Sequence, residues 1–395
     1  MFRTIKDLHL KHKKVLVRVD FNVPQKANGA IADDTRIKAA LPTINYLRKQ
    51  KCIVILMTHL GRPNGVDETL RLDSIAKHLS KLLNHHVTKC DDVIGSEVEE
   101  KVHSLKEGDV CLLENLRFYP EEEQNDDKFA HALADLAQIY INDAFSVSHR
   151  SHASVDAITH YLPSAAGFQL QKEIETIDKL LHNPKHPFIA IMGGVKVSDK
   201  IEVIRHLLKK VDAILIGGAM MYTFFKALGL ETGTSKVEVD KLVIARQLLK
   251  QAHGKLILPL DCVIAKTPDD KGTVTHVTHL AKDVMGLDIG PDTVAIYQEI
   301  LKNAKTVLWN GPMGMFEKKQ FAKGTMALAE TISKSKAVSI IGGGDTADAV
   351  KGFKFTHVST GGGASLDFFA GKTLPGIKAL EENVHCVKHR RFPSH

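Results

Sequence analysis

The stretch VLVRVDFNVP, residues 15–24, decides the fold class of this chain. Apolar residues occupy every second position from Val15 onward, which is typical of a β-strand. The other face begins with a leucine and then carries Arg18, Asp20 and Asn22 before a proline ends the run. The pattern therefore predicts a strand that is apolar on both faces at its start and polar at its carboxyl end.

Similar apolar runs recur along the chain, separated by amphipathic helical stretches. Runs that are apolar on both faces and spaced by helices indicate parallel sheets with helices on both sides. Two such series predict an α/β protein with two doubly wound, Rossmann-like parallel-sheet domains. The expected strands are 15–19, 53–57, 110–114 and 139–143 in the first half, and 188–192, 213–217, 256–260, 307–310 and 338–342 in the second.

The stretch FQLQKEIETIDKLLHNPKHP, residues 168–187, separates the two series. Its apolar residues have helical spacing, and NPKHP ends the helix because proline cannot continue it. We expect a first domain over 1–170, a connecting helix over 171–187, a second domain over 188–372 and a C-terminal segment over 373–395. The last dozen residues are expected to form a frayed end.

Composition argues against several classes of protein. The chain of 395 residues has a net charge of +7, but no dense basic stripe with interleaved aromatic residues, so nucleic-acid binding is not expected. No run of about eighteen apolar residues predicts a membrane span, and the polar start MFRTIKDLHLKHKK does not resemble a secretory signal. The five cysteines are scattered and odd in number. They indicate a reducing cytoplasm, not disulfides or a zinc site.

Polar side chains follow the first-half strands at their carboxyl ends, where open parallel sheets bind ligands. Arginine grips phosphate or carboxylate bidentately, and several arginines in one place would repel each other without an anion. We therefore expect a small, multiply negative ligand whose hydroxyls donate to Asp20 and Asn22. Any single arginine could instead pair with a surface carboxylate, and the histidines could be structural. The residues concerned are Arg36, His59, Arg62, Arg117, His149, Arg150 and His152.

The second-half strands are followed by glycine-rich loops, at 192–200, 216–221, 309–317, 340–347 and 359–365. Glycine lets backbone N–H groups approach a phosphate closely. One such loop has a simpler explanation as a tight turn, but five associated with strands suggest a nucleotide.

Two lysines sharpen this hypothesis. Lys196 and Lys200 are four residues apart at the start of a predicted helix, and they would lie one turn apart if that helix extends back to them. The alternative is a pair of solvated lysines. Asp345, which follows three glycines, could reach a magnesium ion on the phosphates.

Eight motifs, in chain order, resemble those of phosphoglycerate kinases across nearly the whole chain. They are RVDFNVP, HLGRP, LLENLRF, NDAF…HRSH, GGVKVSDK, WNGPMG.FE, GGGDT and GGGAS. Two departures stand out: Val195 replaces the alanine of a GGAKV loop, and FSVSHR replaces FGTAHR before Arg150.

The resemblance implies reversible phosphoryl transfer from 1,3-bisphosphoglycerate to ADP, a glycolytic step that gives 3-phosphoglycerate and ATP with magnesium. It also implies a monomer that closes about a hinge helix. The first domain would bind 3-phosphoglycerate and the second the nucleotide, and the C-terminal segment would return toward the hinge and the first domain. A different acyl-phosphate kinase, or a hinged ligand-binding module, remains an alternative at this point.

The resemblance also implies residue roles. Arg18 would be structural and hold Asp20 in place. Glu317 would bind the ribose, Asp345 the magnesium, and backbone amides at Gly361 to Gly363 would add donors at a helix N-terminus. Catalytic roles fall to Arg36, Lys196, Gly362 and Gly363. The substrate-binding residues would be Asp20, Phe21, Asn22, Arg36, His59, Leu60, Gly61, Arg62, Arg117 and Arg150. The nucleotide-binding residues would be Gly194, Lys200, Gly218, Asn310, Pro312, Glu317, Gly343, Gly344, Asp345 and Thr346.

Overall fold

A computed structural model describes residues 2–386 of the chain. The chain divides into two compact units. Unit 1 comprises Met1–Glu175 and Thr373–His395, and unit 2 comprises Thr176–Lys372. The helix α14 (Pro375–Cys386) includes the first residues of the stretch predicted to fray, so that part of the prediction is wrong. The basic tail at 388–392 lies outside the described residues.

Unit 1 is built on a six-stranded parallel sheet in the order β3-β4-β2-β1-β5-β6. The four strands predicted in the first half are all present, with ends that shift by at most two residues. The other two strands, β3 and β6, have three residues each and give too short an apolar pattern to be predicted. The bounds are β1 Lys14–Arg18, β2 Ile53–Met57, β3 Val87–Lys89, β4 Val110–Leu112, β5 Ile139–Asn142 and β6 Ser164–Ala166.

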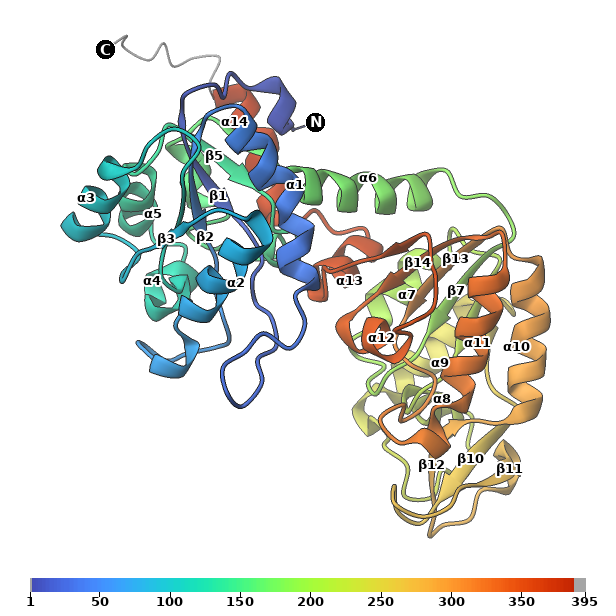
Figure 1. Cartoon of the computed structure of the whole chain (residues 1–395). Helices are drawn as coiled ribbons and strands as arrows, with labels where there is room; N and C mark the ends of the chain where they lie inside the picture. Colours follow the sequence, from blue (N-terminus) through green and yellow to red (C-terminus); the bar gives the residue numbers. More distant parts are fainter. Residues whose placement is uncertain (1, 387–395) are drawn as a thin grey trace. The chain divides into compact units, whose positions relative to one another are not determined.

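Helices cover both faces of this sheet, as expected for apolar strands. Figure 1 shows α1 (Thr35–Lys49) and α2 (Asp73–Leu83) on one face. The other face carries α3 (Ser96–Ser104), α4 (Pro120–Glu123) and α5 (Asp127–Ala134). Short 3₁₀ helices complete the unit at η1 Ile5–Asp7, η2 Glu68–Leu70, η3 Leu116–Phe118, η4 Phe145–Val147 and η5 Ala157–His160.

The C-terminal helix α14 packs within unit 1, beside β6 and η5. Asn383 donates to the carbonyls of Thr159 and Leu162 at 2.7 and 3.0 Å and accepts from the backbone N–H of Ser164 at 2.9 Å. These bonds join residues more than 200 positions apart, so unit 1 requires both ends of the chain.

Unit 2 contains a second six-stranded parallel sheet, in the order β15-β14-β13-β7-β8-β9. All five predicted second-half strands are present, although β9 covers only two residues before Pro259. The two sheets confirm the predicted fold class. The bounds are β7 Phe188–Met192, β8 Ala213–Ile216, β9 Leu256–Ile257, β13 Thr306–Asn310, β14 Val338–Gly342 and β15 His357–Val358.

A small antiparallel sheet in unit 2 was not predicted. Its order is β11-β10-β12, with β10 Asp261–Ala265, β11 Thr273–His276 and β12 Met285–Ile289. The edge strand β11 is largely exposed and has one apolar residue, so its sequence gives no buried face to recognise.

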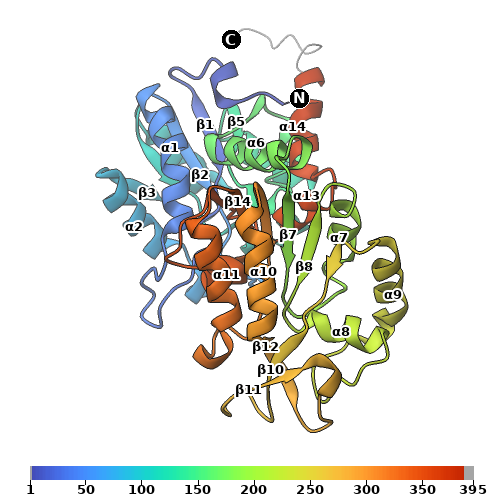
Figure 2. The ribbon, with the colours of Figure 1, turned by 90° about the vertical axis from the view of Figure 1, so that its right-hand side faces the viewer.

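Helices also cover both faces of the large sheet of unit 2. Figure 2 shows α10 (Pro291–Asn303) and α11 (Lys323–Lys334) side by side on one face. The other face carries α7 (Ile201–Leu207), α8 (Met220–Ala227) and α9 (Leu242–Gln251). The remaining elements are η6 Val239–Lys241, η7 Val277–His279, η8 Lys319–Phe321, α12 Gly344–Ala349 and α13 Gly363–Phe369.

The connecting helix α6 spans Phe168–His182 and ends where NPKHP begins, as predicted. Its first turn is capped by Asp143, whose Oδ1 accepts from the backbone N–H of Gln169 at 2.8 Å and of Leu170 at 3.4 Å. Within the described part of the chain, no helix is both long and apolar enough to cross a membrane.

Candidate functional site

The polar residues after β1 are organised around one carboxylate. Asp20 Oδ2 accepts from Arg36 Nη1 at 2.8 Å and from Ser146 Oγ at 2.5 Å. Asp20 Oδ1 accepts from the backbone N–H of Asn22 at 3.1 Å, and Arg36 Nη1 also approaches the Asn22 carbonyl at 3.3 Å. Three donors therefore fix the carboxylate of Asp20. Arg36 uses only its Nη1 group to bond Asp20, so its other N–H groups do not bond this carboxylate.

The loop after β2 is tied to its neighbours by backbone and amide bonds. The backbone N–H of Gly61 donates to Asn22 Oδ1 at 3.0 Å, and its carbonyl accepts from Arg117 Nη1 at 2.7 Å. The amide of Asn115 pairs with both the N–H and the carbonyl of Leu60, at 3.1 and 2.8 Å. Residues predicted from three separate motifs are thus brought together at the carboxyl ends of β1, β2 and β4.

Phe21 fills the core below this surface. Its side chain is buried, and its backbone N–H donates to Thr58 Oγ1 at 2.9 Å. The side chain of Phe21 therefore has a packing role, and only its backbone is polar.

The arginines lie close enough to influence one another. Burial lowers the pKa of Arg117, and the charges of Arg18 and Arg150 add to that effect, although Glu123 at 3.0 Å opposes it. Repulsion among guanidiniums is relieved when an anion binds. Arg62 and Arg150 are exposed, so their forks are accessible to such an anion.

The expected contact between Arg18 and Asp20 is wrong. Arg18 is a fully buried structural residue, as predicted, but it donates to Ser154 Oγ at 2.8 Å, the Val19 carbonyl at 2.6 Å and His59 Nδ1 at 3.1 Å. The strand ends at Arg18, so the alternation that would place Arg18 and Asp20 on one face does not continue to Asp20.

A separate cleft of about 470 Å³ in unit 2 brings together most of the predicted nucleotide residues. Its walls come from the loops after β7, β13 and β14 and from the starts of α12 and α13. Val195, Asp199, Gly311 and Leu366 also line it and were not predicted as site residues. The predicted residues that line it are Gly194, Lys196, Lys200, Asn310, Pro312, Gly343, Gly344, Asp345, Thr346, Gly362 and Gly363.

Lys200 is a largely buried cation in this cleft. It is 8% exposed, and its Nζ donates to Asn310 Oδ1, while Asn310 Nδ2 donates to the Gly342 carbonyl at 2.9 Å. Burial lowers the pKa of Lys200 to about 8, against the opposing effect of Asp199 and Asp345. An ammonium group that has lost its water gains more from a bound anion than an exposed one does.

Lys196 and Lys200 do not share a helical turn. The helix α7 begins at Ile201, so Lys196 lies on the preceding loop and is exposed, whereas Lys200 is the buried N-cap residue. The glycines before Lys196 start a loop instead of a helix. Both side chains nevertheless line the same cleft.

Two predicted nucleotide residues do not line the cleft. Gly218 has a φ of +66°, and a Cβ there would lie 2.4 Å from the backbone N and O of Gly194, so Gly218 supports the first glycine loop from behind. Glu317 is exposed and outside the lining, and its contact with a ribose stays a prediction.

The first turns of two short helices border the cleft. Gly343 and Gly344 begin α12, Gly362 and Gly363 begin α13, and all four line the cavity. Thr346 Oγ1 accepts from the Gly311 N–H at 2.7 Å, which joins α12 to the loop after β13. Backbone N–H groups at these positions are without helical partners and suit phosphate oxygens.

Asp345 is an exposed carboxylate in the first turn of α12. Among residues 2–386, no group of three or more His, Cys, Asp or Glu side chains is arranged to hold a metal ion. Mg²⁺ in kinases is commonly bound by one or two carboxylates together with substrate phosphates. Asp345 fits that arrangement, with the nucleotide supplying further oxygens.

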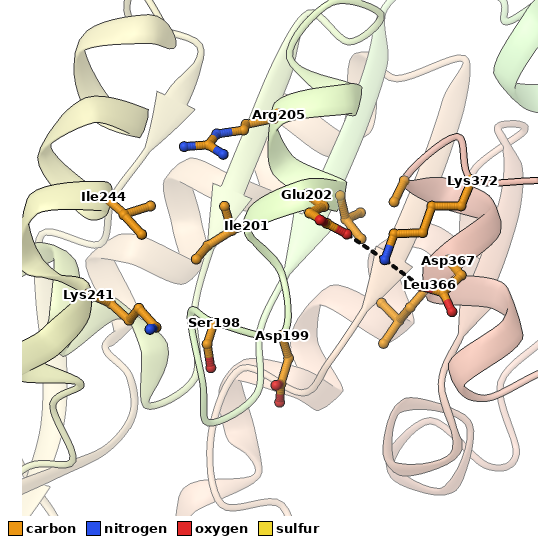
Figure 3. Close-up of a pocket in the computed structure, with 12 residues that line it drawn as sticks. Ser198, Asp199, Ile201, Glu202, Arg205, Lys241, Ile244, Leu366, Asp367 and Lys372 are labelled. Carbon is orange, nitrogen blue, oxygen red and sulfur yellow. Dashed lines mark ion pairs between the residues drawn. The ribbon is translucent and has the colours of Figure 1, made fainter.

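A second cleft, of about 500 Å³, lies between α7, α9 and α13 (Figure 3). Asp199 and Leu366 line both clefts. In Figure 3, Lys372 points between Glu202 of α7 and Asp367 of α13, at 2.5 and 3.0 Å. Lys372 therefore connects α7, which begins after Lys200, with α13, which begins at Gly363.

Comparison with known proteins gives consistent matches. The family model described as phosphoglycerate kinase matches residues 5–372. The chain is 52% identical over 388 residues to the phosphoglycerate kinase of Dictyoglomus turgidum, covering 96% of this chain and 98% of that one. It is 53% identical over 389 residues to that of Moorella thermoacetica, covering 96% and 99%.

Two solved structures are similar over nearly their whole length. The phosphoglycerate kinase from Coxiella burnetii has a TM-score of 0.86 and 38% identity, covering 97% of this chain and 99% of that chain. The phosphoglycerate kinase from Pyrococcus horikoshii OT3 has a TM-score of 0.87 and 35% identity, covering 98% and 100%.

Proposed function

This chain belongs to the phosphoglycerate kinase family, and from that premise we propose that unit 1 binds 3-phosphoglycerate and unit 2 binds the magnesium nucleotide. Like its family, it is a glycolytic kinase that transfers a phosphoryl group reversibly between 1,3-bisphosphoglycerate and ADP, using ATP in the reverse direction. The alternatives of another acyl-phosphate kinase or a non-catalytic module do not agree with these matches.

The assignment of the two sites rests on one observation: the arginines of the predicted substrate set belong to unit 1, whereas the buried Lys200 belongs to unit 2. Unit 1 contains the arginines of the predicted substrate set, and the positive charges of Arg18 and Arg150 help to lower the pKa of Arg117. Unit 2 contains Lys200, buried in a cleft lined by glycine loops. Bidentate forks suit the phosphate and carboxylate of 3-phosphoglycerate, whereas backbone N–H groups and lysine suit a polyphosphate.

In unit 1, the residues that would bind the phosphate that is not transferred are His59, Arg62, Arg117 and Arg150. Asp20 would receive a hydrogen bond from the glycerate hydroxyl, and the remaining N–H groups of Arg36 would face the carboxyl group and the phosphoryl in transit. Two donors already occupy Asp20 Oδ2, so the hydroxyl would use the remaining acceptor capacity of Oδ1.

In unit 2, Lys196 would follow the transferred phosphoryl, and Lys200 the nucleotide phosphates. The backbone at Gly362 and Gly363 would add donors to the transition state. No general base is needed, because both the carboxylate and the ADP phosphate are ionised at pH 7. Catalysis would rest on positioning and on neutralising the charge of the phosphoryl group.

Magnesium would be held by Asp345 and the nucleotide phosphates. When bound, the ion would supply positive charge that offsets the charge of the nucleotide phosphates. The protein's own contribution is to place the Asp345 carboxylate in the cleft that Lys200 and the glycine loops also line. Glu317 would contact the ribose.

We further propose that the chain is a cytoplasmic monomer that closes about a hinge at α6. The four cysteines at 52, 90, 111 and 262 are buried free thiols, which suits a reducing compartment. Closure follows from chemistry, because the reacting atoms must approach to roughly 3–3.5 Å with water excluded. Small-angle scattering should show a clear fall in the radius of gyration with both ligands and a smaller one with each alone. An unchanged radius at saturation with both would contradict closure.

Calorimetric titration of two variants tests the assignment of sites. Arg62→Ala should weaken 3-phosphoglycerate binding and leave Mg-ADP binding unchanged, and Lys200→Met should do the reverse. If either variant weakens the other unit's ligand instead, the assignment is wrong.

A further inference from the structure

A buried hydrogen bond in unit 1 determines the state of a histidine in the proposed substrate site. Arg18 Nη2 lies 3.1 Å from His59 Nδ1, and both residues are buried. A guanidinium has only donors and stays protonated in proteins. His59 Nδ1 must therefore accept the hydrogen bond, which leaves the single ring proton of a neutral imidazole on Nε2.

Arg18 itself is held from three sides. Its Nε donates to Ser154 Oγ at 2.8 Å, and its Nη1 donates to the Val19 carbonyl at 2.6 Å. Ser154 Oγ in turn donates to Glu122 Oε1 at 2.6 Å, and this buried carboxylate lies 3.9 Å from Arg18 Nη2. The guanidinium cannot turn away from His59 without losing these partners.

The charged surroundings of His59 also favour the neutral ring. Burial lowers its pKa well below the ordinary value, and the positive charges of Arg18, Arg117, His152 and Arg36 add to that effect. These groups come from β1, η3, the segment after η4 and α1. The buried carboxylate of Glu122 accepts from Ser154 Oγ at 2.6 Å and lies 3.7 Å from His152 Nδ1.

His59 Nε2 has no hydrogen bond to another residue within 2–386. We propose that Arg18 is a positioning residue that holds His59 as the neutral Nε2–H tautomer, so that His59 offers an N–H donor, and not a positive charge, to the bound substrate. The inference rests on the proposed role of His59 in binding 3-phosphoglycerate.

The tautomer can be observed without any ligand. Long-range ¹H–¹⁵N correlation spectra of the full chain with ¹⁵N-labelled histidine distinguish the two ring nitrogens. The signal of His59 is assigned by its loss in His59→Gln. We expect an unprotonated Nδ1 and a protonated Nε2, unchanged from about pH 6 to pH 8, across the ordinary histidine range. An imidazolium, or a proton on Nδ1, would overturn the proposal.

Variants of Arg18 test its positioning role. Arg18→Lys keeps a side chain with only donors and should keep the Nε2–H tautomer. Arg18→Met should let His59 exchange tautomers and titrate, and should raise the KM for 3-phosphoglycerate with a smaller effect on kcat. Loss of Arg18 leaves the buried Glu122 carboxylate without its neighbouring cation. If Arg18→Met does not fold for this reason, the double variant Arg18→Met/Glu122→Gln removes that buried charge and permits the same measurement. An unchanged tautomer without Arg18 would overturn its positioning role.

Substitution of His59 separates this inference from the proposed function. His59→Ala should weaken 3-phosphoglycerate binding by roughly ten- to hundredfold, the scale of one charge-assisted hydrogen bond. His59→Gln retains an N–H donor and should bind at least about tenfold more tightly than His59→Ala. Unchanged affinity in His59→Ala would overturn the substrate role of His59, whereas the spectra test the tautomer independently.

Discussion

Raising the pH should weaken nucleotide binding through Lys200. The pKa of this lysine falls from 10.5 to about 8 because the side chain is buried. This change in pKa corresponds to a cost of about 3 kcal/mol for keeping the ammonium charged in the protein without ligand. Bound phosphates would restore the charged form, so binding should be coupled to proton uptake above pH 8.

The magnitude follows from the fraction of Lys200 that is charged. At pH 7 nearly all of it is protonated, and at pH 9.5 about one part in 30 is, so Mg-ADP affinity should fall roughly 30-fold between these values. Because the charged form of Lys200 is the protonated one, Mg-ADP affinity is highest below the pKa of Lys200 in the free protein and falls as the pH rises above it. At pH 8, binding should take up about half a proton.

Titration calorimetry of Mg-ADP from pH 7 to 9.5, in two buffers of different ionisation enthalpy, measures both quantities. Lys200→Arg stays charged throughout and should show a flat profile without proton uptake. Lys334→Met removes an exposed lysine of the same unit, paired with Glu330, and should keep the wild-type profile. A flat wild-type profile, or an unchanged fall in Lys200→Arg, would refute the reasoning.

Three further predictions have distinct expected outcomes. Lys196→Ala should lower kcat by about a hundredfold or more, the scale of one preorganised donor, with a smaller change in Mg-ADP affinity; near-normal turnover would remove Lys196 from the mechanism. Arg36→Ala should lower mainly kcat, whereas alanine at Arg62 or Arg150 should raise mainly the KM for 3-phosphoglycerate, and the opposite pattern for Arg36 would contradict its role. Burial raises the pKa of Asp143 to about 7, so stability should fall as the pH rises from about 4 to 7, by up to roughly 4 kcal/mol. Urea unfolding of Asp143→Asn should lack this part of the slope, and an identical slope in both proteins would show that Asp143 does not titrate there.

The strands with strong apolar runs could be predicted from the sequence because their burial on both faces leaves a clear pattern. The run at 15–19 gave β1 with ends shifted by one residue. The strand β11 could not be predicted, because it is an exposed edge strand with only Val274 apolar. Its position depends on pairing with β10, which is a tertiary contact.

The residue types of the candidate sites could be predicted, but their pairing could not. The serine that replaces glycine in FSVSHR was visible in the sequence, yet its hydrogen bond to Asp20 joins residues 126 positions apart. The predicted contact between Arg18 and Asp20 was wrong for a similar reason, since the observed partners, Ser154 and His59, are 136 and 41 positions away in the chain. A shared helical turn for Lys196 and Lys200 required the helix to extend back to Lys196. The helix α7 instead begins at Ile201, after the loop that follows Gly194.

The most direct test of the account is the phosphoryl transfer itself. The purified chain is incubated with Mg-ATP and 3-phosphoglycerate, and ³¹P NMR follows the formation of ADP and 1,3-bisphosphoglycerate. In parallel samples a coupled dehydrogenase removes the 1,3-bisphosphoglycerate. We expect turnover that requires both substrates and is absent with acetate or carbamate in place of 3-phosphoglycerate. Turnover should fall strongly in Arg36→Ala and Lys196→Ala although each variant still binds its ligand. ATP consumption without 3-phosphoglycerate, or full turnover in either variant, would contradict the account.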